Sequence, residues 1–235
     1  MKLDQSKYPA LCIFDVLESE AIARLKLLRL KAKETLPQGG VGEHRNLYLI
    51  LEGVCVNDIL YQSTESLFVS YKLLPGEFVG LYEILSGTIP EQMPSASAKT
   101  PATVLEIPGG EMLRWQAEYP KLYNHVICEV LASHFERRHL NVNCAIKNSL
   151  MSGAYYLSYL YRAYAKGCHP TGYVGPVKIW DTRHEIGVAL SCSTRSVDRI
   201  IRTFLELGFL RVVNGKITIT SIQAAALDEY RTIRQ

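Results

Sequence analysis

The chain has 235 residues, and 48% of them are apolar, which suits one large or two small domains with a hydrophobic core in each. Its longest apolar runs are far shorter than the roughly 18 residues of a membrane span. The first residues, Met1–Lys7, do not contain the apolar core of a secretion signal. We therefore expect a cytoplasmic protein with no membrane partner.

Charge is distributed unevenly along the chain, although the net charge is only +3. From Ser149 onward there are 11 Lys and Arg residues against 6 Asp and Glu residues, a net charge of +5. The first 148 residues carry a net charge of −2. A basic C-terminal part joined to a mildly acidic N-terminal part fits a DNA-binding module attached to a second domain.

The six cysteines are well separated, and no two of them form a CxxC pair. They are Cys12, Cys55, Cys128, Cys144, Cys168 and Cys192. This spacing favours neither a disulfide framework nor an iron–sulfur cluster, and we interpret the cysteines as mostly buried thiols. We predict no metal site and no cofactor. A haem ligand stays open as an alternative, with the candidates His44, His125, His134 and His139.

The N-terminal half reads as a few helices followed by many strands. Residues 15–33 place aliphatic side chains among charged ones, which predicts one or two short amphipathic helices. Short apolar runs then alternate with Gly and Pro turns, and a turn at Pro75–Gly80 leads into another strand. The predicted strands include residues 46–53, 54–60, 66–74 and 103–107. Many short strands separated by such turns predict a β-sandwich or barrel.

A long helix is predicted after the strands, within Glu111–Lys147. Pro120 suits the first turn of a helix, and apolar residues recur at helical spacing after it. A helix from about Lys121 to Ile146 would be about 38 Å long. That length is too great for a cap on a small sheet and is typical of a dimer interface. The alternative is a helix buried within one subunit.

The C-terminal part begins with a helix from Ser149 to Lys166 that we expect to end at Gly167, and residues 147–149 form the predicted hinge before it. Residues 180–210 then predict a helix, a tight turn and a second helix. Thr182 and Glu185 have the spacing of a capping box. Small polar residues interrupt the pattern at 191–193, and Gly208 ends the second helix.

The start of the second helix presents short hydroxyl groups and arginines, which can reach base edges and phosphates in a major groove. We predict DNA contacts for Ser193, Thr194, Arg195, Ser196 and Arg199. The alternative is an ordinary amphipathic helical hairpin with solvated arginines. Asn214-Gly215 between two β-rich runs predicts a hairpin, in which Lys216 would contact a phosphate. A last helix is predicted over Ile222–Ile233.

Several of these motifs share one known pattern. They are Leu47–Gly53, Pro75–Gly80, Thr182–Gly187, Cys192-Ser193, Val197, Arg199-Ile200 and Leu207–Leu210. Together they resemble the catabolite-activator and fumarate–nitrate regulator (Crp/Fnr) superfamily of bacterial transcription regulators, over about residues 14–220. The resemblance implies an α+β fold with a cyclic-nucleotide-binding-like β jelly roll as sensor domain (residues 1–118), a long dimerisation helix (119–147) and a C-terminal winged helix-turn-helix (148–235).

In cyclic-nucleotide-binding members of this superfamily, the turn that corresponds to Pro75–Gly80 opens a cassette that holds the cyclic phosphate. The resemblance makes Gly80, Tyr82 and Glu83 effector-binding candidates, although for Gly80 we favour the interpretation as a structural turn. Relatives usually place a glutamate directly after the glycine, whereas Leu81-Tyr82 follows here. The loop Ser86–Thr100 also contains no arginine to pair with a phosphate. We therefore do not expect cyclic AMP as the effector.

The predicted function is that of a homodimeric, sequence-specific transcription regulator, and not of an enzyme. Its partners would be a double-stranded DNA operator, a second copy of the chain, RNA polymerase and an unidentified small-molecule effector. Relatives often have Arg-Glu where this chain has Thr194-Arg195, which indicates a different operator. The alternatives are a winged-helix protein-interaction module, a constitutive DNA binder without ligand and a cupin-like enzyme, which would need a histidine cluster within the strands.

Overall fold

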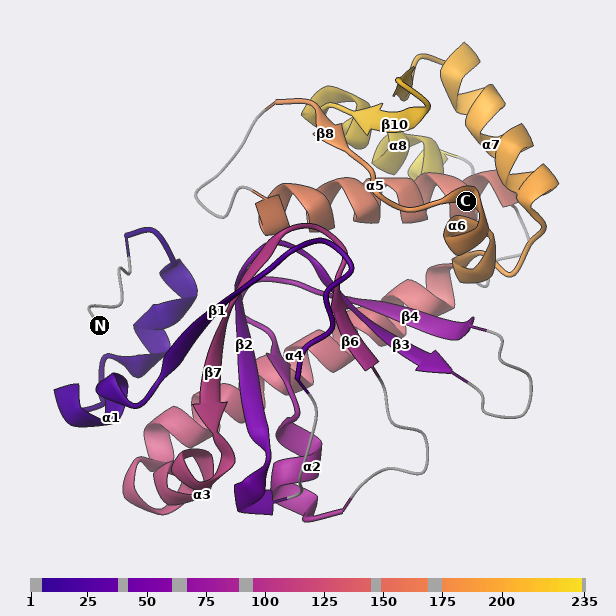
Figure 1. Cartoon of the computed structure of the whole chain (residues 1–235). Coiled ribbons are helices and arrows are strands. Elements are labelled where there is room, and N and C mark those ends of the chain that lie inside the picture. Colours follow the sequence, from indigo (N-terminus) through magenta and orange to yellow (C-terminus); the bar gives the residue numbers. More distant parts are fainter. Residues whose placement is uncertain are drawn as a thin grey trace. The chain divides into compact units, whose positions relative to one another are not determined.

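The computed structural model describes residues 6–37, 42–60, 67–88, 95–144, 149–168 and 175–233. The chain forms two compact units, Met1–His134 and Phe135–Gln235. Strands β1–β7 belong to the first unit, whereas the second unit is mainly helical, and Figure 1 labels elements of both. The predicted α+β fold class is confirmed.

Two antiparallel sheets form the centre of the first unit. In the four-stranded sheet the order is β1 (Lys26–Leu30), β7 (Ala102–Pro108), β2 (Asn46–Glu52), β5 (Phe78–Val79). In the three-stranded sheet the order is β4 (Leu67–Leu73), β3 (Cys55–Leu60), β6 (Ser95–Ala98). Residues of both sheets share one buried cluster, which includes Ile50 and Val104 from the first sheet and Cys55 and Leu73 from the second. The sheets therefore pack face to face.

Strand β2 is buried on both of its faces, which explains why its sequence is a continuous apolar run and does not alternate. Tyr48 and Ile50 point into the cluster between the sheets. Leu47, Leu49 and Leu51 lie in a second cluster on the opposite face. Successive side chains of a strand point to opposite faces of the sheet, so a strand with helices on one side and a sheet on the other needs apolar residues throughout.

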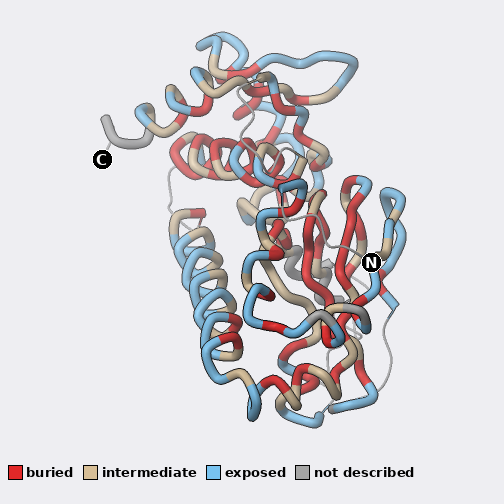
Figure 2. Tube along the Cα trace, turned by 90° about the vertical axis from the view of Figure 1, so that its left-hand side faces the viewer, coloured by how far each residue is buried: buried red, intermediate tan, exposed pale blue. Residues whose placement is uncertain are grey.

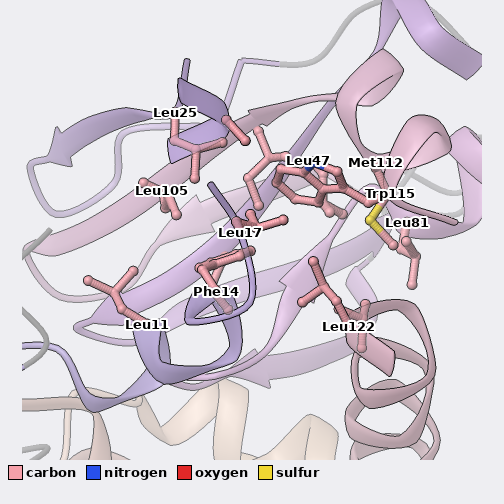
Figure 3. Close-up of a cluster of buried hydrophobic side chains, with 14 of the residues drawn as sticks. Leu11, Phe14, Leu17, Leu25, Leu47, Leu81, Leu105, Met112, Trp115 and Leu122 are labelled. Atoms are coloured by element: carbon pink, nitrogen blue, oxygen red, sulfur yellow. The ribbon is translucent and has the colours of Figure 1, made fainter. Parts of the chain in front are cut away.

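Helical segments cover that second face. They are η1 (Pro9–Phe14), α1 (Ser19–Ala23), α2 (Leu81–Ser86), α3 (Gly109–Glu118) and the first turns of α4 (Pro120–Cys144). Phe14 and Trp115 meet with ring centroids 5.8 Å apart, and Figure 3 shows them with Leu17, Leu105 and Met112 in the same cluster. This layer joins the N-terminal residues to the helices that follow the strands.

Helix α4 begins one residue before the predicted start at Lys121, and the predicted end at Ile146 lies outside the described residues. Its first turns bury Leu122 and Val126 against the sheet unit. Further along, the Ser133 hydroxyl donates a hydrogen bond to the carboxylate of Glu77, which lies in the turn before β5. The rest of α4 is mainly exposed, as the pale blue segments in Figure 2 show.

Three predictions for the first unit were wrong. Residues 26–30 form strand β1 and not a helix, because each of them pairs with β7 in antiparallel register. The expected loop Ser86–Thr100 contains strand β6, whose Ser-Ala-Ser-Ala sequence has too few large apolar residues to indicate a strand. After the turn at Pro75–Gly80, only Phe78–Val79 are extended, and helix α2 (Leu81–Ser86) follows where a strand was expected.

The second unit is a small three-stranded sheet with helices. Its elements are α5 (Ser149–Cys168), β8 (Val177–Lys178), α6 (Arg183–Ala189), α7 (Thr194–Glu206), β9 (Arg211–Val213), β10 (Lys216–Ile219) and α8 (Ser221–Ile233), with strand order β8-β10-β9. Helix α5 continues through Gly167 to Cys168, one residue beyond its predicted glycine end. Of the predicted hinge 147–149, residues 147 and 148 lie outside the described residues.

Close packing in the second unit depends on Gly153 of α5. A Cβ atom at Gly153 would lie 2.6 Å from Cγ2 of Ile200 in α7. A buried hydrogen bond of 2.6 Å joins the Tyr164 hydroxyl, as donor, to the carboxylate of Asp181 just before α6. Burial, followed by the nearby Asp181 charge, raises the pKa of Tyr164 above its ordinary value. These contacts fix α6 and α7 on the α5 scaffold.

The cysteines are less buried than we predicted. Cys55 and Cys144 are buried, and burial raises the pKa of each thiol from 9.0 to about 12. Cys12 and Cys128 are exposed and Cys168 and Cys192 are partly exposed, so the interpretation of the cysteines as mostly buried thiols was wrong. Cys12 lies in the short helix η1, and Cys128 lies on the exposed side of α4, where no apolar layer of the described residues covers them.

Candidate nucleic-acid interface

Helix α6 begins with the predicted capping box. The backbone N–H of Glu185 donates to Oγ1 of Thr182 at 3.2 Å, and the backbone N–H of Thr182 donates to the Glu185 carboxylate at 2.6 Å. Between α6 and α7 the backbone N–H of Cys192 donates to the Gly187 carbonyl. A Cβ atom at Gly187 would lie only 2.7 Å from the Cys192 carbonyl oxygen. The tight turn between the helices therefore requires glycine at this position.

Both ends of α7 are defined by hydrogen bonds that the sequence predicts. Ser193 is the N-cap, and its hydroxyl accepts a hydrogen bond from the backbone N–H of Ser196 at 3.2 Å. At the other end, Gly208 has a left-handed φ of 74°. The N–H groups of Gly208 and Phe209 donate to the carbonyls of Leu205 and Phe204, which is the Schellman pattern.

Helix α7 has one buried face and one basic face. The buried residues are Val197, Ile200, Ile201 and Phe204. The opposite face exposes Arg195, Asp198, Arg199 and Arg202, which follow one another at i, i+3, i+4 and i+7. We call these four residues, together with Ser193 and Ser196, the α7 basic face. They line an open depression of about 530 Å³.

The structure brings together four of the six residues predicted to contact DNA. Ser193, Arg195, Ser196 and Arg199 all line the depression. Thr194 is exposed in the first turn of α7 but does not line it. Lys216 lies on β10, in the hairpin after α7.

Asp198 and Arg202 belong to the α7 basic face, but they were not among the predicted contacts. The sequence prediction considered the first turn of the helix and Arg199. Counting seven residues from Arg195 at helical spacing would have found Arg202. Asp198 is held by Arg183, the first residue of α6, whose Nε lies 3.3 Å from Oδ1 of Asp198.

The predicted hairpin after α7 is confirmed. Strands β9 and β10 pair antiparallel, with Lys216 opposite Val213. Asn214 and Gly215 between them have φ angles of 51° and 75°. Positive φ at both central residues is the mark of the type I′ turn, which Asn-Gly favours. Helix, turn, helix and hairpin thus follow in the order of a winged helix.

The predicted effector residues lie around a buried ion pair in the first unit. Gly80 has a left-handed φ of 94°, and a Cβ atom there would lie 2.9 Å from the Asn46 carbonyl oxygen, so its role as a structural turn is explained. Two residues later, Tyr82 is exposed. Glu83 is only 6% exposed, and its carboxylate accepts a hydrogen bond of 2.9 Å from Nη2 of Arg45, which is 4% exposed.

Arg45 was not predicted from the sequence. It lies just before β2, after the short helix η2 (Gly42–His44), and is separated from Glu83 by 38 residues. Its Nη1 atom is buried and has no hydrogen-bond partner within the described parts of the chain. Because Nη2 of Arg45 donates to it, the Glu83 carboxylate is held in a contact inside the protein.

The four histidines considered as haem ligands, His44, His125, His134 and His139, are all exposed. No group of three or more His, Cys, Asp or Glu residues with the geometry of a metal site occurs among the described residues. None of the described helices is long and apolar enough to cross a membrane.

Comparisons with known proteins find similar folds among solved structures. No protein-family model matches the sequence, and no curated protein matches it. FixK2 from Bradyrhizobium japonicum is similar over 87% of this chain and 96% of its own, with 14% identity and a TM-score of 0.66. A CRP-family transcriptional regulator from Thermus thermophilus covers the same shares, with 20% identity and a TM-score of 0.65.

A second transcriptional regulator from Thermus thermophilus, of the CRP/FNR family, is similar over 88% of this chain and 98% of its own. Its sequence identity is 20% and its TM-score is 0.63. These alignments span both units, from the sheets to the winged helix. The chain therefore has the fold of the Crp/Fnr transcription regulators.

Proposed function

We propose that this chain is a sequence-specific DNA-binding transcription regulator of the Crp/Fnr type. The α7 basic face is the observation that carries the proposal. Arg195, Arg199 and Arg202 are exposed on one side of a helix whose other side is buried, and the N-cap Ser193 stands at its start. Arginine forks match guanine edges and phosphate oxygens, and helix-turn-helix proteins place such a helix in the major groove.

In this proposal the other predicted contacts have supporting roles. Thr194 and Ser196, in the first turn of α7, donate short hydrogen bonds to the DNA backbone or to base edges. Lys216 contacts a phosphate from the β9–β10 hairpin. Arg202, two turns along the helix from Arg195, adds a phosphate contact.

The proposed active form is a homodimer joined through α4. Leu131, Phe135 and Val142 are large apolar residues that are 51%, 56% and 64% exposed. Their spacing of four and seven residues places them on one side of α4. An apolar stripe at coiled-coil spacing is stabilised when a second helix covers it. Two copies would present two α7 helices to successive major grooves, as a palindromic operator requires.

The effector of the proposed regulator is not a cyclic nucleotide. Glu83 is buried and paired with Arg45, so its carboxylate is not available to a ligand. The sequence from Ser86 to Thr100 also lacks an arginine for a cyclic phosphate. A ligand of other chemistry could act only by binding two states of the protein unequally. Activation of transcription would in addition need a contact with RNA polymerase.

A gel shift with a salt titration tests the proposal. The probe is the DNA upstream of the gene for this chain, compared with random DNA of equal length. Binding that releases counterions weakens steeply between about 50 and 200 mM salt. We expect this behaviour and a preference for the upstream probe. If neither probe is bound at low salt, the winged helix serves as a protein-interaction module instead.

A further inference from the structure

The α7 basic face contains one acidic residue among its arginines. Asp198 lies between Arg195 and Arg202 in the sequence and directly before Arg199, and its side chain is 64% exposed. The next acidic residue of the helix, Glu206, is its last residue. A carboxylate repels the phosphates that the neighbouring arginines attract. An acid at this position therefore opposes general DNA binding unless it has a partner in the groove.

Arg183 holds the Asp198 side chain from the neighbouring helix. The contact joins Nε of Arg183 to Oδ1 of Asp198 at 3.3 Å, and Arg183 is less exposed than its partner, at 31% against 64%. Among the described residues, no group donates a hydrogen bond to Oδ2 of Asp198. The ion pair thus limits the rotamers of Asp198 while leaving it an acceptor atom.

The chemistry of a carboxylate restricts what it can bind in a major groove. It accepts hydrogen bonds and donates none, so the acceptor groups of guanine and thymine are unfavourable partners. Adenine offers an amino group, but its N7 acceptor lies next to it. Cytosine presents its N4 amino group as the donor, and Asp or Glu is the matching side chain.

We propose that Asp198 reads a cytosine in each half-site of the operator and that Arg183 is its positioning residue. This inference rests on the proposed function. Asp198 is the fifth residue of α7 and therefore lies within the first turns of the helix. Recognition helices contact bases mainly through these turns.

Selection of binding sites from a random DNA pool, followed by sequencing, tests this inference. The full chain and the Asp198→Ala, Asp198→Asn, Arg183→Ala and Glu206→Ala variants are compared, after thermal melting has shown that each variant folds. Glu206→Ala is the matched control because it removes an equal charge from the far end of the same helix. Affinities for the selected site and its single-base variants are then measured by fluorescence anisotropy.

We expect Asp198→Ala to lose about fivefold or more of the preference for C·G at one symmetric position, while Glu206→Ala keeps it. Asp198→Asn should shift that position toward A·T, because asparagine pairs with the N6 and N7 atoms of adenine. Arg183→Ala should weaken the same preference partially. A role limited to helix packing would not move the preference at a single base pair.

Two results would overturn the inference, and they are distinguishable. If the full chain selects a motif and Asp198→Ala selects the same motif with equal preference at every position, Asp198 reads no base and only the inference fails. If the full chain selects no motif at all, the proposed function fails and the inference fails with it.

Discussion

Arg45 and Glu83 form an ion pair that is almost completely buried, and one nitrogen of Arg45 has no hydrogen-bond partner among the described residues. Burying two charges costs free energy that their attraction only partly returns, but removing one of them leaves the other uncompensated. The pair therefore contributes little net stability while making each of its members hard to replace alone.

Replacing Arg45 alone should be strongly destabilising for this reason. We expect Arg45→Met to lower the free energy of unfolding by about 3–5 kcal/mol, measured by urea unfolding. The double variant Arg45→Met/Glu83→Leu should recover most of that loss. Arg24→Met is the matched control, because the Arg24–Glu111 pair involves an exposed arginine, and it should leave the unfolding midpoint almost unchanged. Equal losses for both single variants would contradict this account.

The buried Cys55 thiol predicts a loss of stability in alkaline solution. Burial raises its pKa from 9.0 to about 12, so the unfolded chain loses this proton first. The protonated Cys55 thiol makes its full contribution to the free energy of unfolding below pH 9. This contribution decreases by about 1.4 kcal/mol per pH unit as the pH rises toward 12.

Urea unfolding at several pH values, with a reductant present, measures this contribution. Between pH 8 and pH 10.5, the stability of the wild type relative to Cys55→Ala should fall by about 2 kcal/mol. Val54→Ala removes a buried neighbour that does not titrate, and its difference from the wild type should stay constant. A constant difference for Cys55→Ala as well would show that the thiol is not protected by burial.

At the scale of elements, the turn between α6 and α7 depends on Gly187. A Cβ atom there would lie 2.7 Å from a backbone oxygen, which cannot move without shifting α7. We expect Gly187→Ala to destabilise the protein by about 1–3 kcal/mol and to weaken DNA binding. Gly110→Ala in α3 is the control, because its Cβ would meet nothing closer than 3.8 Å among the described residues. The prediction fails if both variants melt at the wild-type temperature.

Local patterns predicted the elements of the second unit better than those of the first. Thr182, Ser193 and Gly208 act through residues within six positions, so the ends of α6 and α7 follow from the sequence. Strand β1 depends on pairing with β7, about 75 residues later. Its Lys-Leu-Leu-Arg-Leu sequence fits a helix as well as a strand.

The residues of the candidate site also fall into two groups, those that local sequence predicts and those that depend on contacts between distant segments. Arg195 and Arg199 were predicted because hydroxyl groups and arginines gather at one helix start. Arg202 could have been predicted from helical spacing alone. The Arg183–Asp198 pair depends on the angle between α6 and α7, and the Arg45–Glu83 pair joins distant segments. No pattern of neighbouring residues reveals such contacts.

At the scale of the whole molecule, the proposed dimer depends on the apolar stripe of α4. We expect Phe135→Asp to shift the protein from dimer to monomer in analytical ultracentrifugation, because the new charge would have to be buried in the dimer interface. Asn141→Asp adds the same charge outside the stripe and should leave the dimer intact. A wild-type protein that stays monomeric at all concentrations would remove the basis of this prediction.

In the proposed regulator, the exposed face of α7 reads a DNA sequence. The most direct test is the ratio of affinities for the selected operator and for random DNA, measured by fluorescence anisotropy for the wild type and for Arg195→Ala. We predict that the substitution weakens operator binding by about 1–3 kcal/mol and reduces this ratio. Equal loss on both DNAs would show that Arg195 touches only phosphate, and no loss on either DNA would contradict the account.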